Sequence, residues 1–173
     1  MDTNTSSQPI QLSKTNRQKT RHSLLLGAVL LIMSIVGSAC SCGAPYPPMD
    51  SSAIWKDVKD KYRSWKRAPG FPGREKSENV HGDEVDIFVN DVVQKALDDK
   101  KPITQWPVGS IVMKDGFKGG KLSLVSWMKK LDDGWVWIEW DDKGKALYEG
   151  RPNICTGCHS SGADYVRAFS FPK

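Results

Sequence analysis

The strongest constraint on the fold is a pair of alternating segments, KLSLVSWMKK and GWVWIEWD, joined by a turn that ends in Asp-Gly. Successive side chains of a strand point to opposite faces, and an Asp-Gly turn between two such segments is typical of a β-hairpin. In the second segment Trp135 and Trp137 share one face, while Val136, Ile138 and Trp140 share the other. Because both faces are bulky and apolar, we expect this strand to be central or covered on both sides.

Shorter segments before and after this hairpin complete the predicted fold. EVDIFVN alternates, with Val85, Ile87 and Val89 on one face, and SIVMKD and KALYEG are further short strands. Helical spacing of apolar residues appears in residues 51–67 and again in NDVVQKALDDK. The Pro- and Gly-rich residues 68–82 predict an irregular loop. The order predicts an α+β domain, a predominantly antiparallel β-sheet with flanking helices.

The first 39 residues have the organisation of an export signal. An apolar run over residues 24–36 is followed by small residues before Cys40. That run is shorter than the roughly 20 residues that span a bilayer, so a retained membrane helix is the less favoured alternative. The run is preceded by four basic residues, Lys14, Arg17, Lys19 and Arg21.

Cys40 follows Gly-Ser-Ala, which predicts a lipoprotein signal in which the new N-terminal cysteine is acylated. Acyl chains would then hold the exported, periplasmic protein on a membrane. Processing at Cys42, or simple cleavage that releases a soluble protein, are the alternatives. Residues 40–51 are rich in Pro, Gly and Ser and read as a flexible tether, so the folded domain is expected over residues 52–173.

The charge distribution gives no support to nucleic-acid binding. The formal net charge is +5, but residues 1–39 supply +3 of it. The remainder holds 21 Lys and Arg against 19 Asp and Glu. A nucleic-acid partner would require a clustered basic face, and we expect none.

The motif CTGCH, with Cys155, Cys158 and His159, is the attachment signal of c-type haem. Two thiols add across the two vinyl groups of the porphyrin, and the adjacent histidine binds the iron. A structural zinc site, a redox dithiol and a plain disulfide are the alternatives. Zinc usually requires four protein ligands, a redox dithiol belongs to a βαβ unit, and a disulfide leaves His159 without a role. The sequence therefore predicts one covalently attached haem c per chain.

Four segments in order resemble the cytochrome P-460 and cytochrome c′-β group: VHGDEVDIFVND, WPVGSIVMKDG, LVSWMKKLDDGWVWIEWD and CTGCHSSGADYV. The resemblance covers about residues 52 to 170. It implies an antiparallel β fold, a homodimer, and a five-coordinate haem whose only protein ligand is His159. It also implies chemistry on hydroxylamine, nitric oxide or related small nitrogen species.

P-460 enzymes carry a lysine that is cross-linked to the haem, and the resemblance assigns that position to Lys114. Strand alternation places Lys114 on the same face as Val112. The alternative is a lysine that lies in solvent at the end of its strand. The c′-β branch has no cross-link and binds gases in an apolar pocket.

The iron position opposite His159 decides the function. His81 is a candidate sixth ligand, but we expect it to make structural hydrogen bonds instead. Met113 and Met128 are expected in the core. A distal carboxylate would act as a base in hydroxylamine oxidation; Glu139 and Asp86 are candidates, and Asp164 is expected to be structural.

Three functions follow from these predictions. The first is a P-460-like oxidoreductase that passes electrons from hydroxylamine to another cytochrome. The second is a c′-β-like protein that binds nitric oxide or another gas. The third is a simple electron-transfer cytochrome with a six-coordinate haem.

Overall fold

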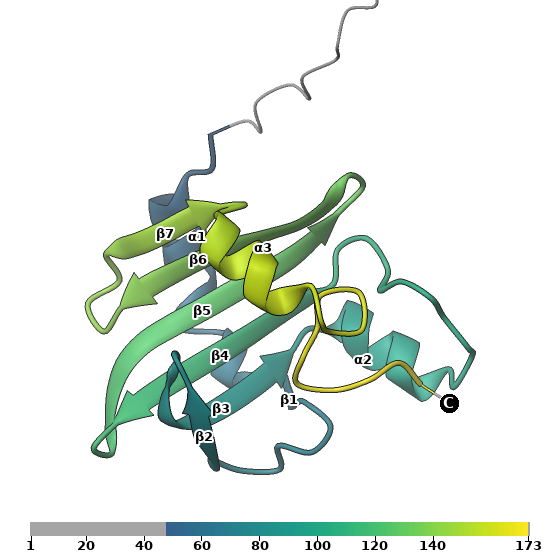
Figure 1. Ribbon diagram of the computed structural model, residues 1–173, viewed down its shortest axis with the longest axis horizontal. Coiled ribbons are helices and arrows are strands. Elements are labelled where there is room, and N and C mark those ends of the chain that lie inside the picture. The colour runs from purple at the N-terminus through teal and green to yellow at the C-terminus, as the bar shows by residue number, and fades with distance from the viewer. Residues whose placement is uncertain (1–47, 173) are drawn as a thin grey trace, which may run out of the picture. The chain divides into compact units, whose positions relative to one another are not determined.

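The computed structural model describes residues 48–172, which form an α+β domain with one mostly antiparallel sheet of seven strands and three α-helices (Figure 1). The predicted fold class is therefore confirmed at the level of architecture. The strand order is β1-β3-β4-β5-β6-β7, and β2 pairs with β3 beside this path. No helix within residues 48–172 is long and apolar enough to cross a membrane. The elements in chain order are α1 (Ser51–Val58), a 3₁₀ turn (Tyr62–Ser64), β1 (Lys66–Arg67), β2 (Glu75–Asn79), β3 (Gly82–Val89), α2 (Asp91–Asp98), β4 (Ile111–Lys118), β5 (Lys121–Leu131), β6 (Gly134–Asp141), β7 (Ala146–Gly150) and α3 (Asn153–His159).

The sheet has a hydrophobic cluster on each face, because the central strands alternate between two sets of apolar side chains. Helices α2 and α3 lie on the first face and α1 lies on the second (Figure 1). The first-face cluster consists of Ala68, Val85, Ile87, Val89, Val93, Trp106, Val112, Met128, Trp135, Trp137, Val166 and Phe169. The second-face cluster consists of Val58, Tyr62, Phe88, Met113, Val125, Trp127, Val136, Ile138 and Trp140.

Strand β6 is covered on both sides, as its sequence predicted. Trp135 and Trp137 are buried in the first-face cluster, and Trp140 is fully buried in the second. The Trp140 ring packs against Trp55 of α1, with ring centroids 5.1 Å apart. Its indole N–H donates to the carbonyl of Ser51 at 3.3 Å, so β6 fixes the start of α1.

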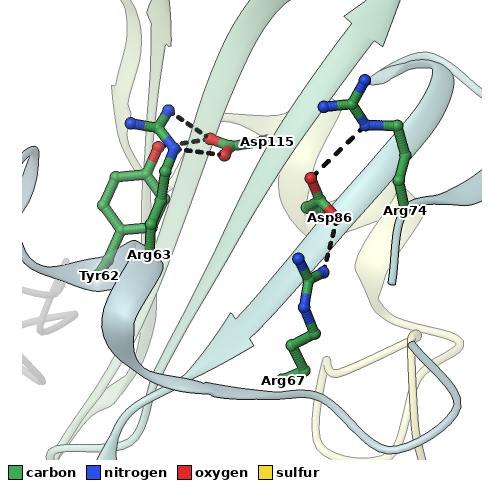
Figure 2. A network of polar contacts seen from close by, with 6 residues as sticks. All are labelled: Tyr62, Arg63, Arg67, Arg74, Asp86 and Asp115. Carbon is green, nitrogen blue, oxygen red and sulfur yellow. Dashed lines mark hydrogen bonds and ion pairs between the residues drawn. The ribbon is translucent and has the colours of Figure 1, made fainter. Parts of the chain in front are cut away.

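A polar network lies on the second face, between β3, β4 and the segments that flank them (Figure 2). It consists of Tyr62, Arg63, Arg67, Arg74, Asp86 and Asp115. Arg63 donates to both oxygens of the buried Asp115, at 2.7 and 3.1 Å, and the Tyr62 hydroxyl donates to the same carboxylate. Arg67 donates to Asp86 at 2.6 Å. Each buried carboxylate is therefore paired, which a carboxylate out of water requires.

Three local predictions are wrong in extent. The helix expected over residues 51–67 ends at Val58, and the chain then turns so that Tyr62 reaches Phe88 and Asp115. The loop expected over residues 68–82 contains β2, whose side chains are mostly exposed. The short strand expected over SIVMKD extends three residues beyond Asp115, because β4 ends at Lys118.

Two predictions of local structure are confirmed. Helix α2 begins at Asp91, with the Asn90 side chain accepting a hydrogen bond from the backbone N–H of Val93. Val85, Ile87 and Val89 of β3 are all buried in the first-face cluster. Helical spacing of apolar residues and strand alternation were sufficient to predict these elements.

Candidate functional site

Helix α3 carries the three residues of the C-x-x-C-H motif on one side. Cys155, Cys158 and His159 stand at positions i, i+3 and i+4, which lie on the same face of a helix. All three line a cavity of about 270 Å³, which is also lined by side chains of the central strands. The two cysteines are free thiols. The structure thus brings the predicted attachment residues together at one cavity.

The register of the sheet aligns a row of side chains beneath this helix. Lys114 of β4 pairs with Ser126 of β5, Ser126 pairs with Glu139 of β6, and Glu139 pairs with Tyr148 of β7. Side chains of directly paired residues lie on the same face of a sheet. All four line the 270 Å³ cavity, so Lys114 faces the cavity together with Val112.

A second cavity, of about 580 Å³, adjoins the first. Residues of β2 and Arg167 line this second cavity but not the first. Cys158 and His159 therefore border both cavities, whereas Cys155 borders only the first. The two cavities share five lining residues: Val80, His81, Lys114, Cys158 and His159.

Apolar side chains at the smaller cavity remain exposed to solvent. Val80, Leu147, Tyr148 and Ile154 line it and keep between 43 and 77% of their surface accessible. Singly exposed apolar residues are ordinary, but a group around one cavity marks a binding surface. A flat apolar ligand in this cavity would cover them.

A turn after α3 orients the imidazole of His159. The Nδ1 atom of His159 lies 2.8 Å from the carbonyl oxygen of Tyr165, which leaves Nε2 for a ligand. The neighbouring Asp164 accepts hydrogen bonds from Lys130 Nζ, at 2.9 and 3.0 Å, and from the backbone N–H of Trp106, at 2.9 Å. The structural role predicted for Asp164 is confirmed.

Burial sets the charge states in the cavity. It lowers the pKa of His159 below its ordinary value and lowers the pKa of Lys114 to about 8, although Glu139 opposes the second shift. It raises the pKa of Cys155 to about 11, and the charge of Glu139 adds to this effect. Burial acts to raise the pKa of Glu139. The effects that lower it, led by the hydrogen bond from His81, outweigh burial and bring the pKa below its ordinary value.

The lining fits a haem that is attached through the motif. Thiols and an imidazole from one helical turn open onto a largely apolar cavity, as thioether attachment and iron ligation require. The buried indole Nε1 of Trp137, another lining residue, has no hydrogen-bond partner among the residues described. The Trp137 ring lies 5.8 Å from that of His159, measured between centroids.

Other candidate residues divide between the two faces. Met113 is buried in the second-face cluster, and Met128 lies in the first-face cluster and lines the smaller cavity. Glu139 lines that cavity, whereas Asp86 is paired with Arg67 in the polar network of the second face. Asp86 lines neither cavity, so the expectation that it could be the distal carboxylate is wrong.

The sequence did not reveal a hydrogen-bonded group of His81, Ser126 and Glu139. The His81 Nδ1 atom lies 2.9 Å from Glu139 Oε1 and 3.1 Å from Ser126 Oγ. Ser126 donates to the same Glu139 oxygen at 3.0 Å. Within residues 48–172 the His81 side chain does make hydrogen bonds, as expected, through Nδ1 alone. Its partners depend on a strand register that no local motif encodes.

Comparison with known proteins adds no assignment. The proposed export signal, Cys40 and Cys42 lie outside the described residues. Within residues 48–172, no three His, Cys, Asp or Glu side chains group to hold a bare metal ion. No protein-family model matches the chain, and no curated protein or solved structure matches it.

Proposed function

We propose that this protein is an exported c-type cytochrome whose haem is attached through Cys155 and Cys158 and bound at iron by His159. One observation carries the proposal: the two thiols and the imidazole open onto the same apolar cavity, whose rim side chains are exposed. When bound, haem supplies an iron centre that exchanges one electron or binds a small molecule. Its electron partner would be another cytochrome.

The residues of the chain divide the work of holding this group. Cys155 and Cys158 would hold the group through two thioether bonds, one to each vinyl group of the porphyrin. The Tyr165 carbonyl holds the Nδ1 side of His159, which directs Nε2 toward the ligand position. Lys76 and Arg167 line the 580 Å³ cavity and supply cations for the carboxylates of a propionate-bearing porphyrin.

Mass spectrometry of protein made with a haem-attachment system tests this proposal. We expect the peptide that contains Cys155 and Cys158 to carry the mass of haem, and the pyridine haemochrome spectrum to show two thioether links. Cys155→Ser and Cys158→Ser variants serve as matched controls, each with one link at most. A colourless wild-type protein without the adduct would refute the proposal.

A second candidate is P-460-like oxidation of hydroxylamine or a related nitrogen species, or c′-β-like gas binding. It rests on the resemblance, and the position of Lys114 favours the P-460 branch. Lys114 lines both cavities, and a pKa of about 8 leaves about a tenth of its amine neutral and nucleophilic at pH 7, far more than for an ordinary lysine. The resemblance also implies a homodimer, which we propose for this chain.

A comparison of Lys114→Ala with Lys118→Ala tests the cross-link. Lys118 lies on the same strand but is exposed and does not line either cavity. We expect a cross-linked protein to lose its red-shifted ferrous absorption in Lys114→Ala only. Identical spectra for wild-type protein and both variants would exclude the bond and leave a c-type cytochrome without it.

A further inference from the structure

His81 is held over the candidate haem site by a buried carboxylate. Its side chain and that of Glu139 are each only 13% exposed, and the Nδ1 atom lies 2.9 Å from Glu139 Oε1. Ser126 donates to the same carboxylate at 3.0 Å. An ionised carboxylate accepts hydrogen bonds, so Nδ1 of His81 is the donor and Nε2 keeps its free lone pair.

Close backbone contacts with β4 also fix the position of His81. His81 lies in the turn between β2 and β3, and this turn rests on β4 (Figure 1). A Cβ atom at Gly116 of β4 would lie 1.8 Å from the His81 carbonyl oxygen, and one at Gly82 would lie 2.5 Å from the Phe117 carbonyl oxygen. Only glycine at these positions permits so close an approach of two backbones.

The distance between the two imidazoles matches a shared metal ion. The ring centroids of His81 and His159 are 6.3 Å apart, and the ring planes meet at 78°. An imidazole nitrogen binds a first-row metal at about 2.0–2.1 Å. The centre of an imidazole ring lies roughly 1.1 Å from its metal-binding nitrogen. Two imidazoles that bind one metal ion from opposite sides therefore have ring centroids about 6.3 Å apart.

Both imidazoles also have the hydrogen-bond pattern of metal ligands. A metal-bound histidine generally donates its other N–H to a carboxylate or a backbone carbonyl. His81 has the Glu139 carboxylate as its partner, and His159 has the Tyr165 carbonyl. In each ring Nδ1 is engaged, which leaves Nε2 for the metal.

The cavities provide room for a wide ligand around this pair. Both the 270 and the 580 Å³ cavity are lined by His81 and His159 together. Cys158 and Lys114 also line both. The two histidines thus stand where the two cavities adjoin.

From these observations we infer that His81 is the second axial ligand of the haem iron, an inference that rests on the proposed attachment of haem to this chain. The resting iron then has a nitrogen ligand on each side. Two strong ligands suit electron transfer, and a small nitrogen species has to displace His81 before it reaches the metal. Glu139 and Ser126 act as positioning residues for this ligand.

Spectroscopy of the full-length protein with haem attached tests the inference. We expect the wild-type protein to give the absorption and electron paramagnetic resonance spectra of low-spin iron with two imidazole ligands. His81→Ala is expected to become high-spin while keeping its haem adduct, and added imidazole should restore the low-spin spectrum. Asp83→Ala is the matched control two residues further along the chain, because Asp83 is exposed and lines neither cavity, and it should remain low-spin.

Two further measurements keep the outcomes separate. Carbon monoxide should bind to the reduced His81→Ala variant at least tenfold faster than to the wild-type protein, because no protein ligand has to leave. A high-spin wild-type spectrum, or a low-spin His81→Ala variant, overturns the inference while the attached haem still stands. Loss of the haem adduct from the wild-type protein would instead overturn the proposed function. If His81→Ala does not fold, the wild-type resonance spectrum alone decides.

Discussion

Removal of the Asp164 carboxylate should destabilise the segment that orients His159. Asp164 and Lys130 form an ion pair in which each side chain is only 10% exposed, and Asp164 also accepts the Trp106 backbone N–H. Breaking a buried pair costs about 3–5 kcal/mol, because it leaves an unpaired charge. Asp164 has a φ of +46°, a region where alanine costs about 1 kcal/mol more. We therefore expect Asp164→Ala to lower the free energy of unfolding by about 4–6 kcal/mol.

Asp164→Asn separates the charge from the backbone geometry. Asparagine tolerates positive φ and still accepts a hydrogen bond, so only the charge is lost and the expected cost is about 2–3 kcal/mol. Urea titration followed by far-UV circular dichroism measures both values. In a double-mutant cycle with Lys130→Met, the two costs should be less than additive by at least about 1.5 kcal/mol. Additive costs, or a loss below about 1 kcal/mol in Asp164→Ala, would refute the reasoning.

Three other perturbations have definite expected outcomes. Gly116→Ala places a Cβ 1.8 Å from the His81 carbonyl oxygen and should lower the free energy of unfolding, measured by urea titration, by about 1–3 kcal/mol. The control Gly73→Ala has open space around it and should change this free energy little. Equal losses in the two variants would contradict the contact. In protein made without a haem-attachment system, burial lowers the pKa of Lys114 from 10.5 to about 8. Between these pH values the unfolded chain binds more protons than the folded chain, so the free energy of unfolding should rise by about 3 kcal/mol from pH 8 to 10.5. A Lys114→Met variant should lack this rise in chemical denaturation, and a rise of equal size in the variant would assign it to another group. Burial and then the hydrogen bond to Asp115 raise the pKa of Tyr62. In an ultraviolet titration of the folded protein, one tyrosine should therefore remain protonated at about pH 11, one pH unit above the ordinary pKa of 10. Complete ionisation of the tyrosines at that pH in the folded protein would contradict this.

Much of the sheet was predictable because its signals are local. The alternation in β3 and β6 gave the buried faces, and the helical spacing of apolar residues gave α2. Strand β2 was not predictable, since its EKSEN sequence has no apolar alternation and pairs through its backbone beside β3. The shortened α1 reflects a tertiary contact, because Tyr62 bonds to Asp115, 53 residues away.

The candidate site was predictable only in part, for the same reason. Cys155, Cys158 and His159 lie within one helical turn, so their spacing alone indicated shared chemistry. His81 and Glu139 are 58 residues apart, and their contact depends on the register of four strands and on the turn that rests on Gly116. No pattern along the chain encodes that combination.

The two faces of the sheet have consequences for how this protein changes over time. Along β4, Met113 and Asp115 belong to the packed and paired second face, while Val112 and Lys114 border the cavities. Adjacent residues of this strand are therefore under separate selection, those of one face for folding and those of the other for the properties of the cavities. A chain built this way can exchange the residues that line its cavities without first rebuilding the scaffold that supports them.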